Sequence, residues 1–154
     1  MKIRQAVKKD GAEIGQLLRE MGWFSGLAAE TPAQTEARIA RLLADVSVVE
    51  SHSVYVAEEA GRVVGYTAVH WLPYLFMTGP EGFVSELFVR ETVRGQGVGR
   101  QLLAAVETEA RQRGCTRLSL LNGRHRESYQ RQFYEKMGWE ERPFMANFVY
   151  YFVE

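Results

Sequence analysis

Three glycines at every second position, with an arginine on either side, form the part of this chain whose chemistry is easiest to interpret. Residues 94–100 read Arg-Gly-Gln-Gly-Val-Gly-Arg and lie between an apolar segment and an amphipathic one. Glycine gives the backbone conformations closed to other residues and lets a ligand approach the main chain closely. The first amides of a helix lack internal partners and lie at the positive end of the helix dipole. The pattern therefore predicts a phosphate or pyrophosphate site.

Three other interpretations of this loop can be weighed from the residues alone. A P-loop ends in Gly-Lys-Ser/Thr, but Gly99 is followed by Arg100 and Gln101, so this interpretation fails. A dinucleotide-binding loop has Gly-x-Gly-x-x-Gly and an acidic residue at the end of the next strand, where this chain has Asn122. A glycine-rich turn before an ordinary helix is the third alternative. The apolar segment in front of the loop and Arg94 count against it.

The histidines and the cysteine give little support for metal or thiol chemistry. His52, His70 and His125 lack the spacing of metal ligands, so no metal is expected. Cys115 is the single cysteine, and it is expected at the edge of the sheet opposite the glycine loop. We interpret it as a core residue rather than as the nucleophile of a two-step transfer.

Length and composition indicate one domain that covers residues 1–154. The 19 basic and 19 acidic residues cancel, which argues against a nucleic-acid-binding or anionic-membrane surface. No apolar run reaches the about 18 residues that a membrane span needs, and no signal-peptide core is visible near Met1. With its lone cysteine, the protein is expected to be cytoplasmic.

The elements that must position the loop follow from hydrophobic periodicity and turn residues. Strands are expected at residues 2–7, 53–60, 62–71, 83–89, 115–121 and 146–153. Helices are expected from Asp10 to about Met21, from Thr31 onward, from the glycine loop to Gly114, and at about 126–137. Thr31 and Gln34 form the clearest capping box, and Asp10 and Glu13 form another. This order indicates an α/β fold with a mixed sheet.

Two aromatic stretches outside the predicted helices call for an explanation, because large apolar side chains in loops often mark binding surfaces. One is the loop at residues 23–27, and the other is the connection at residues 72–80. We predict that they form the wall of a substrate pocket, with a dimer contact or a folded-over core edge as an equal alternative. The candidate substrate-binding residues are Trp23, Phe24, Trp71 and Tyr74.

Two motifs together resemble a known family. Arg94-x-x-Gly97-x-Gly99 resembles the Arg/Gln-x-x-Gly-x-Gly/Ala signature of the GCN5-related N-acetyltransferases (GNAT), and Phe-Tyr-Glu-Lys-Met-Gly-Trp at residues 133–139 is similar to a later motif of that family. The motifs and the elements between them cover residues 83–139. Two positions depart from the family pattern. Glu127 stands where the family often has asparagine, and Glu91 stands where it commonly has proline.

The resemblance implies a fold and an activity. The fold is α/β, with a mixed, mostly antiparallel central sheet of six to seven strands and about four helices on both faces. The activity is transfer of the acetyl group of acetyl-CoA (coenzyme A) to a primary amine of a small-molecule or peptide acceptor, by direct attack in a ternary complex. A homodimer is compatible with the family. Two rival functions stay open: an acyl-CoA-binding sensor or interaction module without catalysis, and a nucleotide-binding regulator.

The resemblance also implies roles for individual residues. The residues expected to bind the cofactor are Phe88, Val89, Arg94, Gly95, Gln96, Gly97, Val98, Gly99, Arg100 and Asn122. Tyr134 is the candidate acid for the leaving thiolate, with a core aromatic role as the alternative. Glu86 is the candidate base, directly or through water, because a carboxylate inside an apolar strand is costly unless it is paired or functional. A structural ion pair or a solvent-facing position is an equal alternative for Glu86.

Overall fold

The computed structural model describes residues 1–46 and 50–152, and the chain forms two compact units, Met1–Leu120 and Leu121–Glu154. The first unit contains the glycine loop and the whole sheet, and the second contains the motif at residues 133–139. The two motifs singled out in the sequence therefore lie in different units.

The first unit is built on one mixed sheet of five strands in the order β1-β2-β3-β4-β5. The strands are β1 (Lys2–Gln5), β2 (His52–Glu59), β3 (Arg62–Leu72), β4 (Glu81–Val89) and β5 (Arg117–Leu120). The first three pairings are antiparallel and the pairing of β4 with β5 is parallel. The predicted α/β class with a mixed, mostly antiparallel sheet is therefore confirmed.

The predicted count of six to seven strands is wrong for the part of the chain that the structure describes. A final strand is expected from the sequence at residues 146–153, but residues 146–152 pair with no strand, and residue 153 lies outside the described part. The aromatic side chains that suggest this strand are almost fully exposed, as for Phe148 and Phe152. Alternating aromatic residues form a strand only where a partner strand hydrogen-bonds to their main-chain groups, and residues 146–152 have no such partner.

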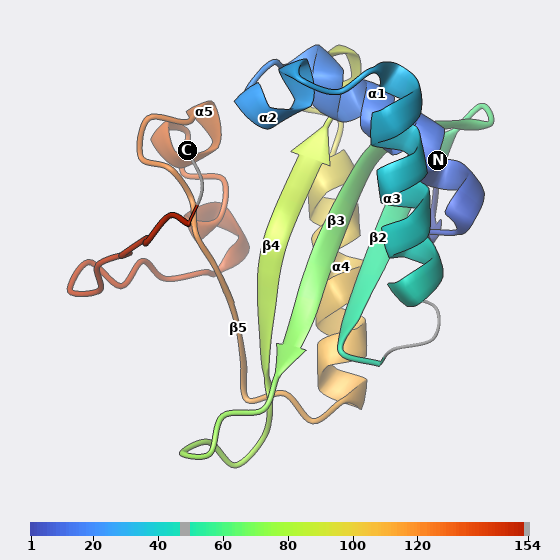
Figure 1. The fold of residues 1–154 in the computed structure, drawn as a ribbon. Helices are drawn as coiled ribbons and strands as arrows, with labels where there is room; N and C mark the ends of the chain where they lie inside the picture. The colour runs from blue at the N-terminus through green and yellow to red at the C-terminus, as the bar shows by residue number, and fades with distance from the viewer. Residues whose placement is uncertain (47–49, 153–154) are drawn as a thin grey trace. The chain divides into compact units, whose positions relative to one another are not determined.

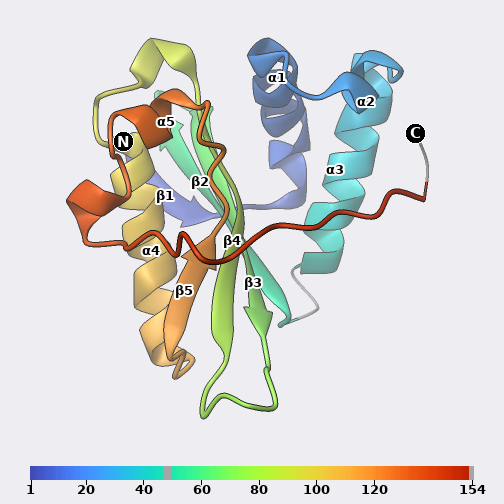
Figure 2. The same cartoon turned by 90° about the vertical axis from the view of Figure 1, so that its left-hand side faces the viewer.

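Two longer helices cover one face of the sheet and a third covers the other (Figure 1 and Figure 2). Helices α1 (Gly11–Met21) and α3 (Pro32–Val46) lie on the first face, and α4 (Val98–Gln112) lies on the second. A short helix, α2 (Ser25–Ala28), connects α1 to α3. Short 3₁₀ helices precede α1 and follow β4, at Lys8–Asp10 and Glu91–Val93. Among the described residues, none of these helices has the length and apolarity that crossing a bilayer requires.

The two predicted capping boxes have different outcomes. At α3, the Thr31 amide donates to Gln34 Oε1 at 2.8 Å and the Gln34 amide donates to Thr31 Oγ1 at 3.2 Å, which confirms the prediction. At α1, Asp10 makes no side-chain capping bond. Its carboxylate instead accepts from Arg4, at 2.8 and 2.9 Å, and from the Val7 amide at 2.8 Å. A charged guanidinium competes successfully for a carboxylate that would otherwise cap the helix.

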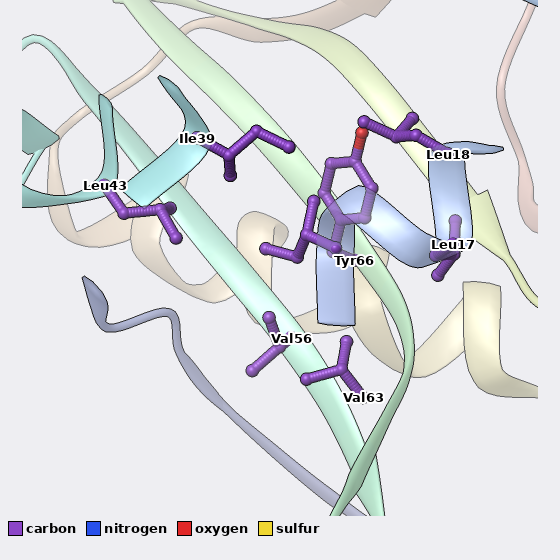
Figure 3. Packing of buried hydrophobic residues seen from close by; sticks show 8 residues of the cluster. Leu17, Leu18, Ile39, Leu43, Val56, Val63 and Tyr66 are labelled. Atoms are coloured by element: carbon purple, nitrogen blue, oxygen red, sulfur yellow. The ribbon is translucent and has the colours of Figure 1, made fainter. Parts of the chain in front are cut away.

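One core cluster of the described residues lies between the sheet and the pair α1 and α3. The side chains are mostly aliphatic, and one aromatic ring, that of Tyr66 on β3, lies among them (Figure 3). Tyr66 is only 3% exposed, so its hydroxyl must find a partner inside the protein. On the other face, Val98 and Leu102 of α4 pack with Ala57 and Val64 of the sheet.

The second unit is mostly irregular. Its only regular elements within residues 121–152 are α5 (Glu127–Gln130) and a 3₁₀ helix at Glu135–Met137. The continuous helix predicted at about 126–137 is therefore wrong. The backbone of Gln132 has a φ of 56°, a left-handed conformation that ends the helical hydrogen-bond pattern, and Gly138 with a φ of 90° ends the second turn.

Candidate active site

The glycine loop leads from the 3₁₀ helix after β4 into α4. Gly95 and Gly97 have φ values of 77° and 82°, which glycine adopts without the steric penalty of a side chain. Gly97 is the residue before α4, and no side chain caps it among the described residues. A β-carbon placed on Gly95 or Gly97 would meet no atom within 4 Å, so the space beside this backbone is open. The uncapped amides at the start of α4 can therefore accept an anion.

A buried arginine, which the sequence did not single out, fastens the start of this loop to the body of the unit. Arg90 follows β4 directly and is 8% exposed. Its guanidinium donates to the Val63 carbonyl at 2.9 Å, to Glu13 Oε2 at 3.2 Å, and to Glu20. These bonds tie the end of β4 to β3 and α1. The loop thus starts from a fixed point, although residues 94–97 are exposed.

Strand β4 has a strand neighbour on its β5 side over only part of its length. The parallel pairing runs from Glu81–Arg117 to Val84–Leu120. Among the described residues of the first unit, no strand pairs with residues 85–89 on that side. An extended ligand could bond to main-chain groups of this half of β4, as an added strand does. The glycine loop follows this half of β4 after the 3₁₀ helix Glu91–Val93.

A β-bulge in β4 determines where the side chain of Glu86 points. Opposite β3, Glu86 faces Ala68 and Val84 faces Val69, so Ser85 is the extra residue. Bulges redirect side chains and are common beside active sites. Glu86 is half-buried, and the Tyr66 hydroxyl donates to its Oε1 atom at 3.0 Å. Burial, and next the negative charge of Glu86, raise the pKa of Tyr66, so Tyr66 stays a hydrogen-bond donor.

The predicted aromatic residues of the first loop, Trp23 and Phe24, contact Phe88, which follows Glu86 by two residues on β4. The ring of Phe88 is 6.0 Å from Trp23 and 5.5 Å from Phe24, measured between centroids, and 5.8 Å from Tyr66. The structure therefore brings together Trp23, Phe24, Phe88 and Glu86, which come from two distant parts of the sequence.

The other two candidate substrate-binding residues lie elsewhere. Trp71 is 6% exposed and sits on the α4 side of the sheet, where its Nε1 donates to Ser53 Oγ at 3.1 Å and Arg113 lies 4.9 Å from its ring. Tyr74 contacts Phe76 in the connection between β3 and β4. Figure 1 and Figure 2 place this connection at the end of the sheet opposite α2. The structure does not join either residue to Glu86, and we leave both outside the acceptor site.

Two histidines on the Tyr66 side of the sheet form a pair that their spacing in the sequence does not predict. His52 and His70 are paired across β2 and β3, and their rings stack at 5.4 Å. The ring of His70 is 2.9 Å from the hydroxyl of Ser85, the bulged residue. Burial, and next His52, lower the pKa of His70, so a neutral imidazole is favoured there. Antiparallel register is the signal that could have predicted this pair.

Cys115 does not have the properties of a nucleophile. It is half-buried after α4, and its amide donates to the Ala110 carbonyl at 2.9 Å. Burial raises the pKa of its thiol, which lowers the fraction of reactive thiolate at neutral pH.

The remaining predicted residues, Tyr134 and Asn122, belong to the second unit. Tyr134 is half-buried there, with ring centroids 5.0 Å from Phe133 and 6.0 Å from Trp139. Burial raises the pKa of Tyr134 to about 12. Asn122 accepts a hydrogen bond from the Ser128 hydroxyl at 3.0 Å, which links the segment before α5 to that helix.

Comparison with known proteins agrees with this geometry. A model of the acetyltransferase (GNAT) family matches residues 18–139. An acetyltransferase of Agrobacterium fabrum is 39% identical over 80 residues, so the match spans 51% of this chain and 51% of that relative. An aminoglycoside N(6')-acetyltransferase of Stenotrophomonas maltophilia is 34% identical over 122 residues, which are 76% of this chain and 72% of the relative.

The fold is also similar to solved structures. A transcriptional regulator from Bacillus halodurans superposes with a TM-score of 0.82 over 98% of this chain and 99% of that chain, at 23% sequence identity. At this identity the likeness concerns the fold.

Proposed function

The chain belongs to the acetyltransferase (GNAT) family, and from that premise we propose that it transfers the acetyl group of acetyl-CoA to an amine by direct attack in a ternary complex. One observation carries the proposal. An open, uncapped glycine loop follows, after one short 3₁₀ helix, on a strand that carries a hydrogen-bonded carboxylate and, among the described residues of the first unit, a half without a strand neighbour. Anchoring of an acyl-CoA and removal of a proton from an amine need these features side by side.

The residues present fit the pyrophosphate and pantetheine parts of acetyl-CoA. The amides of residues 94–100 would hold the pyrophosphate, since the space beside Gly95 and Gly97 is open. The exposed Arg94 and Arg100 can add charge-assisted hydrogen bonds. Phe88 and Val89 lie on the half of β4 for which the described part of the first unit offers no strand neighbour on the β5 side, and their main-chain groups would bind the pantetheine arm. When bound, acetyl-CoA supplies the activated acetyl thioester.

Glu86 is the group proposed to remove the proton from the amine. An amine in water carries a proton at neutral pH and must lose it before its nitrogen can attack. A half-buried carboxylate can attract the ammonium ion and accept this proton, directly or through a water molecule. The Tyr66 hydroxyl, 3.0 Å away, holds the carboxylate in one position. Tyr66 is thus a positioning residue.

Tyr134 is proposed to donate to the departing thiolate. Its pKa of about 12 keeps the hydroxyl protonated at neutral pH. A thiol has an ordinary pKa of about 8.5, below that of Tyr134, so complete proton transfer from this hydroxyl to a free thiolate is uphill. The hydroxyl can instead donate a hydrogen bond that stabilises the negative charge on sulfur as the thioester bond breaks. Asn122 and the side chain of Gln96 stay predicted contacts of the cofactor.

The test of the proposed function is release of free thiol from acetyl-CoA with a panel of amines. We expect release that depends on both enzyme and amine, with an acetylated amine as the product by mass spectrometry. Coenzyme A binding without transfer to any amine would favour the non-catalytic sensor instead. Absence of coenzyme A binding would contradict both functions and leave the nucleotide-binding regulator.

If Glu86 is the base, its replacement should lower kcat/KM strongly, and replacement of its hydrogen-bond partner Tyr66 should lower it less. Glu86→Gln is expected to lower kcat/KM for the amine by about 100-fold, because general base catalysis is typically worth this much. Tyr66→Phe keeps the ring in the core and removes only the hydroxyl, so a smaller loss of about tenfold is expected, with about 1 kcal/mol lower stability. Steady-state kinetics and urea unfolding measure the two quantities.

Glu59→Gln is the matched control for this pair, because Glu59 is an exposed carboxylate at the end of β2. It should leave activity unchanged. The affinity for coenzyme A should be the same in all three variants. Wild-type activity in Glu86→Gln would show that the carboxylate is structural.

A further inference from the structure

Four aromatic side chains form a continuous row from the core to the surface on the acceptor side of β4. The row consists of Tyr66, Phe88, Trp23 and Phe24. The ring centroid of Phe88 is 5.5 to 6.0 Å from each of the other three, and these contacts are edge to face, whereas Trp23 and Phe24 are 6.5 Å apart and tilted. Contacts of this kind fix the rings in place, because edge-to-face pairs are favoured by the aromatic quadrupole.

The inner end of the row is buried and polar, and the outer end is exposed and apolar. Tyr66 is 3% exposed, whereas Trp23 and Phe24 are 43% and 38% exposed. Aromatic surface left in water costs free energy, and a concentration of it on one face marks a surface that binds apolar groups. The exposed rings come from the short loop between α1 and α2, which is at the same end of the sheet as the glycine loop (Figure 1).

The charge at the inner end is negative. Glu86 accepts from the Tyr66 hydroxyl, and Phe88 lies two residues farther along β4, so both side chains are on one face of the sheet. The nearby Arg38 is held by Glu30, with bonds of 2.8 and 2.9 Å, and these bonds raise its pKa. The charge of Glu86 also raises the pKa of Arg38, by less than Glu30 does. The hydrogen bonds of this guanidinium go to Glu30, so we expect the Glu86 carboxylate to stay accessible to a cation.

From this arrangement we infer that the acceptor is an amine joined to an aromatic or bulky apolar group, with its ammonium at Glu86 and its apolar group against Phe88, Trp23 and Phe24. The inference rests on the proposed function and adds the class of acceptor to it. The ammonium gains attraction from both the carboxylate and the faces of the surrounding rings. The apolar group covers the two exposed rings. A polycation or a sugar amine would leave them in water.

The test compares two amines that differ in this group. With acetyl-CoA as donor, kcat/KM for 2-phenylethylamine should exceed that for ethylamine by roughly 10- to 100-fold, the range that an apolar contact supplies. Trp23→Ala and Phe24→Ala should each reduce this ratio by about tenfold. Phe76→Ala removes an exposed ring at the opposite end of the sheet and should keep the wild-type ratio. A wild-type ratio near one would overturn the inference while acetylation of both amines would still support the proposed function.

A binding measurement keeps the inference testable if no amine is acetylated. Calorimetric titration of the protein with 2-phenylethylammonium or ethylammonium, in the presence of coenzyme A, gives the dissociation constant of each ion. Tighter binding of 2-phenylethylammonium by about tenfold, lost in Trp23→Ala, would support the inference even if the proposed transfer fails. Equal affinities, or no binding of either ion, would overturn it.

Discussion

Replacing Gly97 with aspartate is expected to weaken coenzyme A binding by at least about 100-fold, equivalent to about 2.8 kcal/mol, while the protein stays folded. Two effects act together. A side chain at a φ of 82° is strained, and the new carboxylate would stand at the start of α4, where the pyrophosphate is proposed to bind. The open space beside Gly97 means that no neighbouring residue has to move. Calorimetric titration with coenzyme A measures the loss.

The matched control for this prediction is Gly61→Asp. Gly61 has a φ of 77° in the turn between β2 and β3, and a β-carbon placed on it would likewise meet no atom within 4 Å. This variant therefore has similar backbone strain and the same added charge, but in the turn between β2 and β3 rather than at the start of α4. Its affinity for coenzyme A should equal that of the wild type. If Gly97→Asp binds coenzyme A as well as Gly61→Asp does, the glycine loop is not the anion site.

Circular dichroism and thermal unfolding complete the test. Wild type and Gly61→Asp, at a coenzyme A concentration of a hundred times the dissociation constant, should gain about 2.7 kcal/mol of stability. Gly97→Asp should gain almost none at the same concentration. If Gly97→Asp is folded but is not stabilised by coenzyme A, the substitution has removed the binding site and has not unfolded the protein.

The elements that depend on local chemistry were predictable from the sequence. Gly61 between two alternating segments predicted the β2–β3 hairpin, and the structure has it. Thr31 and Gln34 predicted the start of α3. The apolar strand, the glycine loop and the amphipathic helix that follows were predicted in order, and the parallel pairing of β4 with β5 agrees with the expected crossover.

The errors arose where a distant residue or the backbone itself decides the outcome. Arg4 takes the carboxylate of Asp10 that was expected to cap α1. Gln132 adopts a left-handed conformation and ends a helix whose side-chain pattern alone would continue. Neither event has a marker in the local sequence, since arginine has many potential partners and glutamine rarely adopts a positive φ.

The composition of the candidate site was only partly predictable for the same reason. The pairing of Tyr66 with Glu86 depends on the register of β3 and β4, and the bulge at Ser85 changes that register. A simple alternation would not reveal it. The sequence did contain a signal against Trp71 as a pocket residue. It is five residues from Tyr66 on the same strand, and an odd separation places the two rings on opposite faces of the sheet. Contact between Trp23 and Phe88 needs the folded chain.

Replacing Tyr134 with phenylalanine is expected to lower kcat by about 100-fold or more while the affinity for coenzyme A changes little. The substitution removes one hydroxyl and keeps the ring that packs against Phe133 and Trp139. General acid catalysis typically contributes about 100-fold or more to a rate, so its loss should appear in turnover rather than in binding. Steady-state kinetics at saturating acetyl-CoA and calorimetric titration with coenzyme A measure the two effects.

Tyr129→Phe is the matched control, because it removes a tyrosine hydroxyl from the same unit. The Tyr129 hydroxyl donates to Glu141 at 3.0 Å, and we assign it no role in transfer. Its loss should leave kcat unchanged. An unchanged kcat in Tyr134→Phe, measured beside this control, would remove Tyr134 from the mechanism.

The pH profile adds a second readout for Tyr134. An ordinary tyrosine, with a pKa of about 10, is half ionised at about pH 10 and can no longer donate a proton in half of the molecules. Because burial raises the pKa of Tyr134 to about 12, only about 1% is ionised at that pH. Ionisation of Tyr134 should therefore not reduce the kcat of the wild type between about pH 8 and about pH 10. A fall with a midpoint near pH 10 that is present in the wild type and absent in Tyr134→Phe would show that the hydroxyl titrates as an exposed tyrosine, which contradicts the buried acid proposed for this position.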